Sequence, residues 1–305
     1  MKILVTGGAG FIGSHVVDAF INAGHDVVII DNLITGTEEN INPQATFYKM
    51  DIRDKKVIAV FEKEKIDVVD HHAAQMDVRR SVDDPIYDAQ NNILGVINLL
   101  QASVKNGVKK FIFISSGGAI YGEQDYFPAD EEHALRPLSP YGITKLTGEK
   151  YLHFYFHTYG LNYVILRYAN VYGPRQSPHG EAGVVAIFTT KLLANDQPVI
   201  NGDGTQTRDY VFVGDVVQAN LKALAYNKID YFNIGTGIEA DVNEIFHQLN
   251  DLTNGQAEES HGPAKQGEQL RSVLNYQKAK DILNWSPRVN LTNGLKKTAA
   301  YFNGK

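Results

Sequence analysis

The chain has 305 residues, of which 43% are apolar and 21% charged, and this balance excludes disordered, collagen-like and fibrous proteins. Its formal net charge of −6 has the wrong sign for a dedicated nucleic-acid binder, so we expect no nucleic-acid partner. Cysteine is absent, which excludes disulfides, thiolate catalysis and zinc–sulfur sites. The sequence has no leader-like start and no membrane-length apolar run, and we expect a cytoplasmic protein with no membrane contact.

Predicted strands and helices alternate through the first half of the chain. Short β-branched runs predict strands at 3–5, 27–30, 46–50, 68–69, 111–114 and 164–166. Between them, apolar residues at helical spacing predict helices at 10–23, 55–64, 87–106 and 141–158. This alternation is typical of a parallel sheet with crossover helices. We therefore predict an α/β fold built on a Rossmann-type, doubly wound parallel sheet.

The pattern loosens after residue 172 into loops rich in Gly, Pro and Asp. This change predicts a smaller C-terminal lobe. Val211–Val213 and Tyr231–Ile234 still have the character of strands, so we expect the chain to return to the first sheet. The predicted domains are a dinucleotide-binding domain at 1–172, with return segments near 211–235, and a mainly substrate-binding lobe at 173–305.

A glycine-rich motif, TGGAGFIG, joins the first predicted strand to the first predicted helix. In such a motif Gly7 permits a tight turn, Gly10 lets the backbone approach a pyrophosphate, and Gly13 allows close helix–strand packing. The helix N-terminus favours the anion. Phe11 and Ile12 lie within the motif and are assigned to the cofactor site with the glycines. The alternative is a purely structural glycine turn.

Asp31 ends the second predicted strand, 18 residues after the glycine motif. A carboxylate about 20 residues beyond the motif bonds the ribose hydroxyls of a bound dinucleotide. The four residues after Asp31 include no Arg or Lys to receive a 2′-phosphate, so NAD is favoured over NADP. We place Asn32 in the same site, and Asp51 and Ile52 on its adenine side. An Asp such as Asp51 can also be an ordinary turn or cap residue.

Tyr141 and Lys145 lie four residues apart in a segment where Pro140 marks a helix start. This spacing places both side chains on one helical face. An ammonium group and an oxidised nicotinamide beside the phenol lower its pKa below the usual value of about 10. Tyr141 can then act as a base toward a sugar hydroxyl. Such pairs also arise by chance, and the upstream glycine motif is what favours catalysis here.

Six segments together resemble the extended short-chain dehydrogenase/reductase family, and most closely its UDP-hexose 4-epimerases, such as the bacterial UDP-glucose 4-epimerases. They are TGGAGFIG at 6–13, SSGGAIYG at 115–122, SPYGITK at 139–145, RYANVYGPRQ at 167–176, GEAGVVAIF at 180–188 and GDGTQTRDYVFVGD at 202–215. The resemblance extends from residue 1 almost to the end of the chain. It implies NAD as the cofactor and a UDP-sugar as the substrate.

The resemblance also implies roles for individual residues. Tyr141 would be the catalytic base, and Lys145 would orient the nicotinamide ribose and lower the pKa of the phenol. Asn92 is expected beside the cofactor. Asn170 and Arg208 are expected at the diphosphate end of the substrate. Outside such motifs, an Asn is more commonly a helix cap and an Arg a solvated charge.

One departure from the family concerns the catalytic hydroxyl. Gly117 occupies the position of the family's usual Ser or Thr. Ser116 is adjacent and is our candidate for reaching the sugar hydroxyl. Alternatively, Ser115 and Ser116 only satisfy backbone groups at the end of the strand.

A second departure lies near the C-terminus. The family's RPGD-like element is KQGE here, starting at Lys265, and lysine keeps the positive charge but loses bidentate phosphate geometry. Aligned from Lys265, Ser272 falls where family members carry either a tyrosine or a small residue beside the C2 substituent of the sugar. A serine leaves room for an N-acetyl group.

The sequence therefore predicts an NAD-dependent epimerase that interconverts UDP-glucose and UDP-galactose through a 4-keto sugar, with the N-acetyl analogues as further candidate substrates. Rival enzymes of the same fold are a UDP-sugar dehydratase, a decarboxylase and a UDP-glucuronate epimerase. A dehydratase would carry Asp-Glu where this chain has Gly118 and Ala119. A non-catalytic NAD-binding sensor is a rival from another class, against which Tyr141 and Lys145 argue.

The predicted helix at 141–158 is rich in aromatic residues. His153 and His157 are spaced to share one helical face, but no third ligand is near in the sequence, so we expect a packed helix and no metal site. The aromatic residues, together with the paired-helix dimers of the resembled family, predict a homodimer.

Overall fold

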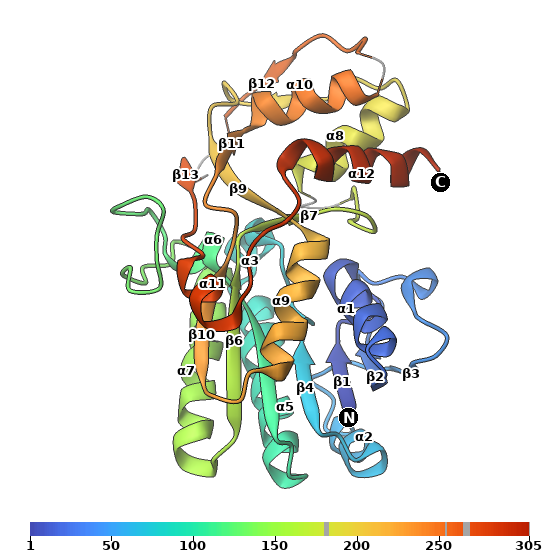
Figure 1. Ribbon diagram of the computed structural model, residues 1–305, viewed down its shortest axis with the longest axis vertical. Coiled ribbons are helices and arrows are strands. Elements are labelled where there is room, and N and C mark those ends of the chain that lie inside the picture. The colour runs from blue at the N-terminus through green and yellow to red at the C-terminus, as the bar shows by residue number, and fades with distance from the viewer. Residues whose placement is uncertain (180–182, 254, 265–268, 305) are drawn as a thin grey trace.

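A seven-stranded parallel sheet forms the centre of the structure (Figure 1). The computed structural model describes residues 1–179, 183–253, 255–264 and 269–304. The strands of the sheet are β1 (Lys2–Thr6), β2 (Asp26–Asp31), β3 (Thr46–Lys49), β4 (Val68–His71), β5 (Lys110–Ser116), β6 (Asn162–Tyr168) and β10 (Asp230–Ile234). Their order is β10-β6-β5-β4-β1-β2-β3, and every neighbouring pair is parallel. All six strands predicted from the first half are present, and β10 is a seventh.

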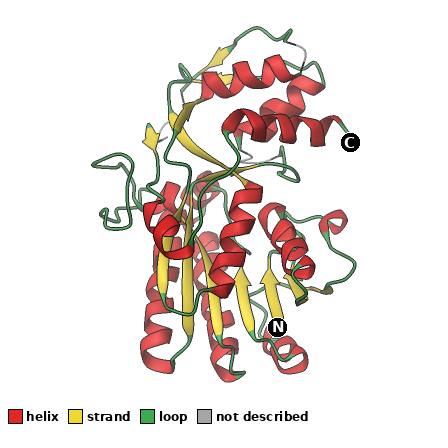
Figure 2. Ribbon diagram, viewed as in Figure 1, coloured by secondary structure: helices red, strands yellow, loops and turns green. Residues whose placement is uncertain are grey.

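Helices cover both faces of this sheet (Figure 2). One face packs against α1 (Phe11–Asn22), α9 (Val213–Ala225) and α11 (Gln277–Leu283), and the other against α2 (Val57–Glu64), α5 (Gly95–Lys105) and α7 (Pro140–Tyr159). Successive strand side chains point to opposite faces, so that Val5 joins the core on the α1 side and Leu4 joins the core on the α5 side. The sheet is doubly wound, and the predicted fold class is confirmed.

One predicted helix is divided into three parts. The segment 87–106 forms α4 (Pro85–Ala89), a π-helical turn η2 (Gln90–Leu94) and α5. The turn buries Asn91 and Asn92. Single π-helical turns are frequent at functional sites, and this one packs against α7.

The smaller lobe is built on a second, four-stranded sheet. Its strands are β7 (Asn170–Tyr172), β9 (Thr207–Phe212), β11 (Glu239–Asp241) and β13 (Arg271–Ser272). The lobe also contains the strand pair β8 (Ile200–Asn201) and β12 (His261–Gly262), and the helices α8 (Val184–Leu193), α10 (Val242–Leu252) and α12 (Leu291–Asn303). The remaining short elements are η1 (Glu38–Asn40), α3 (Val78–Asp83) and α6 (Gly117–Ile120).

Of the two segments predicted to return to the first sheet, only one does so. Tyr231–Ile234 lies in β10, which pairs with β6. Val211 instead lies in β9 of the lobe sheet, and Val213 begins α9. A short β-branched run does not indicate which sheet a strand will join, because strand pairing is decided by tertiary contacts.

The strand order reverses at β1, with β2 on one side and β4 on the other. In open α/β sheets this switch point creates a crevice at the carboxyl ends of the strands, where dinucleotides bind. The lobe lies over this edge of the sheet (Figure 1). The arrangement therefore places any ligand of the crevice between the sheet and the lobe.

Candidate active site

The glycine motif forms a tight turn between β1 and α1. Gly7 has a φ of +72°, which favours glycine, and a Cβ there would lie 2.7 Å from the backbone N of Ala73. A Cβ on Gly13 would lie 2.2 Å from the Gly7 carbonyl oxygen, to which the Gly10 N–H also donates at 3.0 Å. Because side chains are excluded from this turn, a pyrophosphate can approach the N-terminus of α1. The turn fits the phosphates of NAD.

Phe11 and Ile12 anchor the same turn in two directions. Phe11 packs against the lobe core, and Ile12 packs against the core on the α1 side of the sheet. The glycine turn is thereby joined to both parts of the molecule. Contact of either side chain with the cofactor stays a prediction.

Asp31 lies beside the glycine turn, at the end of β2. Its Oδ2 accepts a hydrogen bond from the Ala9 N–H at 3.1 Å, and its Oδ1 accepts one from the Leu33 N–H at 2.8 Å. Burial raises the pKa of this carboxyl, and the two backbone N–H groups oppose that rise. Asp31 therefore shapes the turn, in addition to its predicted bonds with the ribose.

Asp51 pairs with Arg53, a residue that the sequence analysis did not identify. The Arg53 guanidinium donates from Nε and Nη2 at 2.9 and 2.7 Å, and this pairing holds the pKa of Asp51 at about 2. Asn32 Nδ2 donates to the same carboxylate at 3.2 Å, and the neighbouring Ile52 is buried. The Asp51 carboxylate neutralises the charge of Arg53. Arg53 therefore provides no unpaired cation for the 2′-phosphate of NADP.

Two serines fix the start of α7. Ser139 Oγ accepts a hydrogen bond from the Gly142 N–H at 3.2 Å, which satisfies one of the free amides of the first turn. Ser81 on α3 accepts a hydrogen bond from the Tyr141 N–H, also at 3.2 Å. As a result, Tyr141 and Lys145 are presented at the carboxyl end of β5.

Lys145 and Tyr141 are brought together as the sequence predicts. Lys145 Nζ donates to the Ile114 carbonyl oxygen at 2.8 Å and lies 5.8 Å from the centroid of the Tyr141 ring. Burial lowers the pKa of Lys145 to about 8. Burial raises the pKa of Tyr141 to about 12, against a hydrogen bond from Ser116 that lowers it. A cationic cofactor beside the phenol would favour the phenolate.

Ser116 remains the candidate for the hydroxyl that Gly117 lacks. The Ser116 side chain hydrogen-bonds Tyr141. A Cβ at position 117 would lie 2.4 Å from Cδ1 of Leu274, so a side chain there would displace the Leu274 side chain. Leu274 follows the last strand of the lobe, so the lobe fills the space of the family's usual catalytic hydroxyl.

Asn170 faces the same small space as Ser116. A Cβ on Gly118 would lie 3.5 Å from Asn170 Oδ1 and 4.0 Å from Ser116 Oγ. Asn170 is exposed at the start of β7. A ligand over Gly118 would therefore meet the Asn170 amide and the Ser116 hydroxyl together.

Ser116→Ala is expected to lower turnover at least tenfold with little change in substrate affinity, because it deletes the hydroxyl bonded to the Tyr141 phenol. Ser115→Ala is the matched control, since the buried Ser115 Oγ has no hydrogen-bond partner in the part of the chain that the structure describes. Steady-state kinetics of both variants provide the measurement. Wild-type turnover in Ser116→Ala would remove Ser116 from the chemistry.

Asn92 is held by a network of buried polar groups. Its Oδ1 accepts a hydrogen bond from the Gln75 N–H at 2.8 Å, and its Nδ2 donates to the Gln75 carbonyl oxygen at 2.8 Å and to Asp88 at 2.9 Å. These bonds engage both ends of the amide. We therefore expect Asn92 to shape the wall of the cofactor site.

Arg208 and Ser272 are register partners on the parallel strands β9 and β13. Partners in a ladder present their side chains on the same face of the sheet. Arg208 is partly buried and donates to the Thr207 carbonyl oxygen at 2.8 Å, whereas Ser272 is buried. Lys265 lies outside the described residues.

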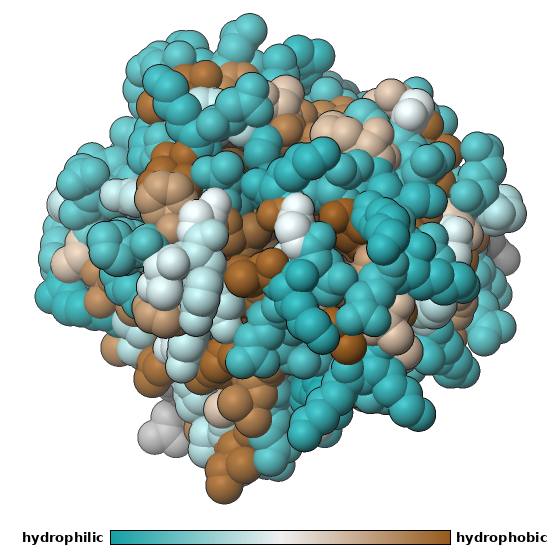
Figure 3. Space-filling view, turned by 90° about the horizontal axis from the view of Figure 1, so that it is seen from below, coloured by the Kyte–Doolittle hydropathy of each residue, from teal (hydrophilic) through white to brown (hydrophobic). Residues whose placement is uncertain are grey.

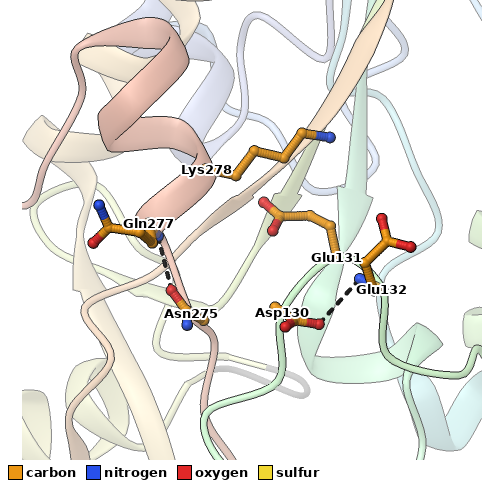
Figure 4. Close-up of a pocket in the computed structure, with 6 residues that line it drawn as sticks. All are labelled: Asp130, Glu131, Glu132, Asn275, Gln277 and Lys278. Carbon is orange, nitrogen blue, oxygen red and sulfur yellow. Dashed lines mark hydrogen bonds between the residues drawn. The ribbon is translucent and has the colours of Figure 1, made fainter.

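An open hollow of about 360 Å³ lies away from these residues, where the segment before α7 meets α11 (Figure 4). The residues that line it are Asp130, Glu131, Glu132, Asn275, Gln277 and Lys278. None of them was predicted as a site residue. Within the described ranges, no three His, Asp or Glu side chains are grouped to hold a metal ion.

None of the helices in the described ranges is long and apolar enough to cross a membrane. The cytoplasmic location expected from the sequence stays a prediction.

The Rossmann-type sheet and the glycine turn at its switch point define a dinucleotide-binding fold. Residues 3–235 match the NAD dependent epimerase/dehydratase family. The UDP-glucose 4-epimerase of Mycolicibacterium smegmatis is 42% identical over 311 residues, which cover 100% of this chain and 99% of the relative. This chain belongs to the NAD dependent epimerase/dehydratase family, as the sequence motifs predicted.

Two solved structures are similar over the whole chain. The UDP-glucose 4-epimerase of Thermotoga maritima with UDP-glucose is 50% identical, with a TM-score of 0.98 over 100% of this chain and 99% of that one. The Thermus thermophilus UDP-glucose 4-epimerase in complex with NAD is 42% identical, with a TM-score of 0.96 and the same coverage.

Proposed function

We propose that this chain is an NAD-dependent 4-epimerase that interconverts UDP-glucose and UDP-galactose. The observation that carries the proposal is the placement of Tyr141, Lys145 and Ser116 at the carboxyl end of β5, next to the switch point of the sheet. The likeness to UDP-glucose 4-epimerases over the full chain supports the same activity.

The residues of the site divide the work of the reaction. Bound NAD supplies a reversible hydride acceptor for C4 of the sugar. Tyr141 takes the proton of the C4 hydroxyl, and Ser116 bonds the same oxygen. After the 4-keto sugar has turned over in the pocket, Tyr141 returns the proton. The reaction therefore produces no net oxidation.

The lobe would hold the nucleotide part of the substrate. Asn170 at the start of β7 and Arg208 on β9 belong to its sheet, and we assign both to the diphosphate. The charge of Arg208 suits a pyrophosphate, to which a guanidinium can donate two parallel hydrogen bonds.

Incubation of the purified protein with UDP-glucose, without added NAD, tests the proposal. We expect UDP-galactose as the product, resolved by chromatography. A 4-keto-6-deoxy product would instead identify a dehydratase. In a parallel incubation with UDP-glucuronate, release of carbon dioxide would identify a decarboxylase. Absence of turnover with NAD supplied in excess would favour a non-catalytic sensor.

Ser272→Tyr is expected to remove activity on UDP-N-acetylglucosamine and leave activity on UDP-glucose. A phenol in place of the buried Ser272 hydroxymethyl group would fill the space that we assign to the N-acetyl group, and overpacking of this kind costs about 1–3 kcal/mol or more. Rates on the two substrates provide the measurement, and Ser272→Ala is the control. Retention of both activities in Ser272→Tyr would place residue 272 outside the sugar pocket.

We also propose that the protein is a homodimer paired through η2 and α7. Large apolar side chains remain exposed on η2 and α7, among them Leu94, Ile143, Phe154 and Tyr159. Figure 3, which views the molecule from the lower end of these helices, shows apolar groups at the surface between hydrophilic ones. Light scattering should give a mass near twice 33.8 kDa. A mass of one chain at working concentrations would contradict the proposal.

A further inference from the structure

A buried carboxylate lies behind the Tyr141–Lys145 pair. Asp88, on α4, is 0% exposed. Its Oδ1 accepts hydrogen bonds from Gln75 Nε2 at 3.0 Å and Asn92 Nδ2 at 2.9 Å. Its Oδ2 accepts one from the Thr144 hydroxyl at 2.9 Å. Three donors thus converge on one carboxylate, which is the arrangement that an ionised Asp requires when it is buried.

The bond to Thr144 connects Asp88 to the catalytic helix. Thr144 stands three residues after Tyr141 and directly before Lys145, on the same side of α7 as the tyrosine. A helix with one side chain fixed in this way cannot rotate about its own axis without breaking that bond. Asp88 therefore sets the direction in which Tyr141 and Lys145 point.

Asp88 also supplies the negative charge that acts on Lys145. The Lys145 side chain is buried, and its hydrogen bond to the Ile114 carbonyl oxygen carries no compensating charge. Burial raises the pKa of Asp88 and lowers the pKa of Lys145, and the opposite charge of each group opposes the shift of the other. Asp88 also raises the pKa of Tyr141.

The other titratable groups around Lys145 do not supply this charge. On β4, His71 faces Lys145, and burial holds its pKa well below the usual range, with a further lowering by Lys145 itself and by His72. A neutral His71 therefore adds no charge to the pair. Ser116, on β5, contributes only its hydroxyl.

We infer, building on the proposed function, that Asp88 is the counter-charge of Lys145 and the clamp on α7, and thus a positioning residue for the Tyr141–Lys145 pair. It touches neither reacting atoms nor substrate. Its negative charge keeps the Lys145 ammonium charged in a buried site, and its bond to Thr144 keeps the pair aimed at the sugar.

Asp88→Asn removes the negative charge of residue 88 and keeps the size and shape of its side chain. The amide oxygen can still accept from Gln75 and Asn92, and the amide N–H can donate to Thr144, whose own proton is then free for the Tyr141 carbonyl oxygen at 2.9 Å. The hydrogen-bond network and the fold should therefore survive. Asp84→Asn is the matched control, because it removes the same charge from an exposed residue that caps the same helix and asparagine caps equally well.

The pH–rate profile is the readout that a merely structural role would not move. Because the charge of Asp88 raises the pKa of both Lys145 and Tyr141, its removal should move both limbs of the kcat profile toward acid, by about one pH unit. At pH 8 the Asp88→Asn rate should fall about fivefold, as Lys145 loses its proton, whereas at pH 6 the rate should stay equal or rise. KM should not change. Asp84→Asn should keep the wild-type profile.

Thr144→Val tests the clamp alone. It removes the hydroxyl that Asp88 holds and leaves every charge in place, so turnover should fall at all pH values without movement of the limbs. If Thr144→Val kept wild-type turnover, the bond between Asp88 and Thr144 would not position α7.

A second measurement is independent of enzyme activity. The pKa of Lys145 can be followed by NMR through its ¹³Cε signal in ¹³C-lysine-labelled protein, assigned with Lys145→Arg. It should lie near 8 in the wild-type protein, lower in Asp88→Asn and unchanged in Asp84→Asn. An equal pKa in all three proteins would overturn the inference. If the NMR shift is found but the wild-type protein turns over no UDP-sugar, the proposed function fails and the inferred charge pair stands.

Discussion

Tyr141→Phe should lower epimerisation of UDP-glucose at least a hundredfold while NAD affinity stays close to that of the wild-type protein. The substitution removes one hydroxyl, which the structure places in a hydrogen bond with Ser116. Loss of a general base costs about 10²–10⁴ in rate, and phenylalanine provides no other proton acceptor. The contacts described above for α7, among them the Tyr141 N–H bond to Ser81 and the Thr144 bond to Asp88, do not involve the Tyr141 hydroxyl and are unaffected.

Initial rates on UDP-glucose and titration with NAD together decide this prediction. Tyr159→Phe is the matched control, because it removes the same hydroxyl from an exposed residue at the other end of α7. If Tyr141→Phe retained more than a tenth of wild-type activity, the base would have to be another group. Loss of NAD binding along with activity would instead show that the phenol supports the cofactor site.

The alternation of short β-branched runs and amphipathic segments was sufficient to predict the main sheet and most of its helices. Each of these elements is determined by its own segment of sequence, because apolar residues recur with a different period in a strand and in a helix. The glycine motif was predictable for the same reason, because its turn, helix start and close contacts all fall within residues 6–13. The pairing of Tyr141 with Lys145 follows from their spacing along one helix.

The residues that surround this pair could not be predicted, because they come from distant parts of the chain. Asp88 becomes significant only when α4 packs against α7, and no local signal marks it. Ser81, which caps α7 from α3, is equally distant in sequence. Arg53 lies beyond the four residues that follow Asp31, although its spacing of two from Asp51 could have suggested the ion pair.

The position of the family's usual catalytic hydroxyl could not be interpreted from the motif alone. Gly117 marks the absence of the usual side chain, but the reason lies in Leu274, whose side chain occupies the space. The contact joins positions 157 residues apart, so no sequence pattern predicts it. The adjacent Ser116 bonds Tyr141, and the kinetic test of Ser116→Ala decides between the two alternatives left open by the sequence.

Gly13→Ala should weaken NAD binding at least tenfold, by displacing the turn that receives the pyrophosphate. The added methyl group would lie 2.2 Å from the Gly7 carbonyl oxygen and 2.9 Å from its carbonyl carbon, and backbone atoms cannot rotate away as the end of a side chain can. Overpacking of this kind costs about 1–3 kcal/mol, and about 1.4 kcal/mol corresponds to a tenfold change in affinity. The shift would move Gly7 and Gly10 away from the position that a pyrophosphate needs.

Titration of the protein with NAD, together with thermal unfolding, checks this prediction. Gly304→Ala is the control, because a Cβ there meets its nearest neighbour at 3.6 Å, an ordinary contact, at the far end of the chain. Unchanged NAD affinity in Gly13→Ala would show that the dinucleotide does not bind over this turn. A lower unfolding temperature with wild-type affinity would place the cost in the packing of α1 on β1, since the methyl group then disturbs the fold without reaching the phosphate site.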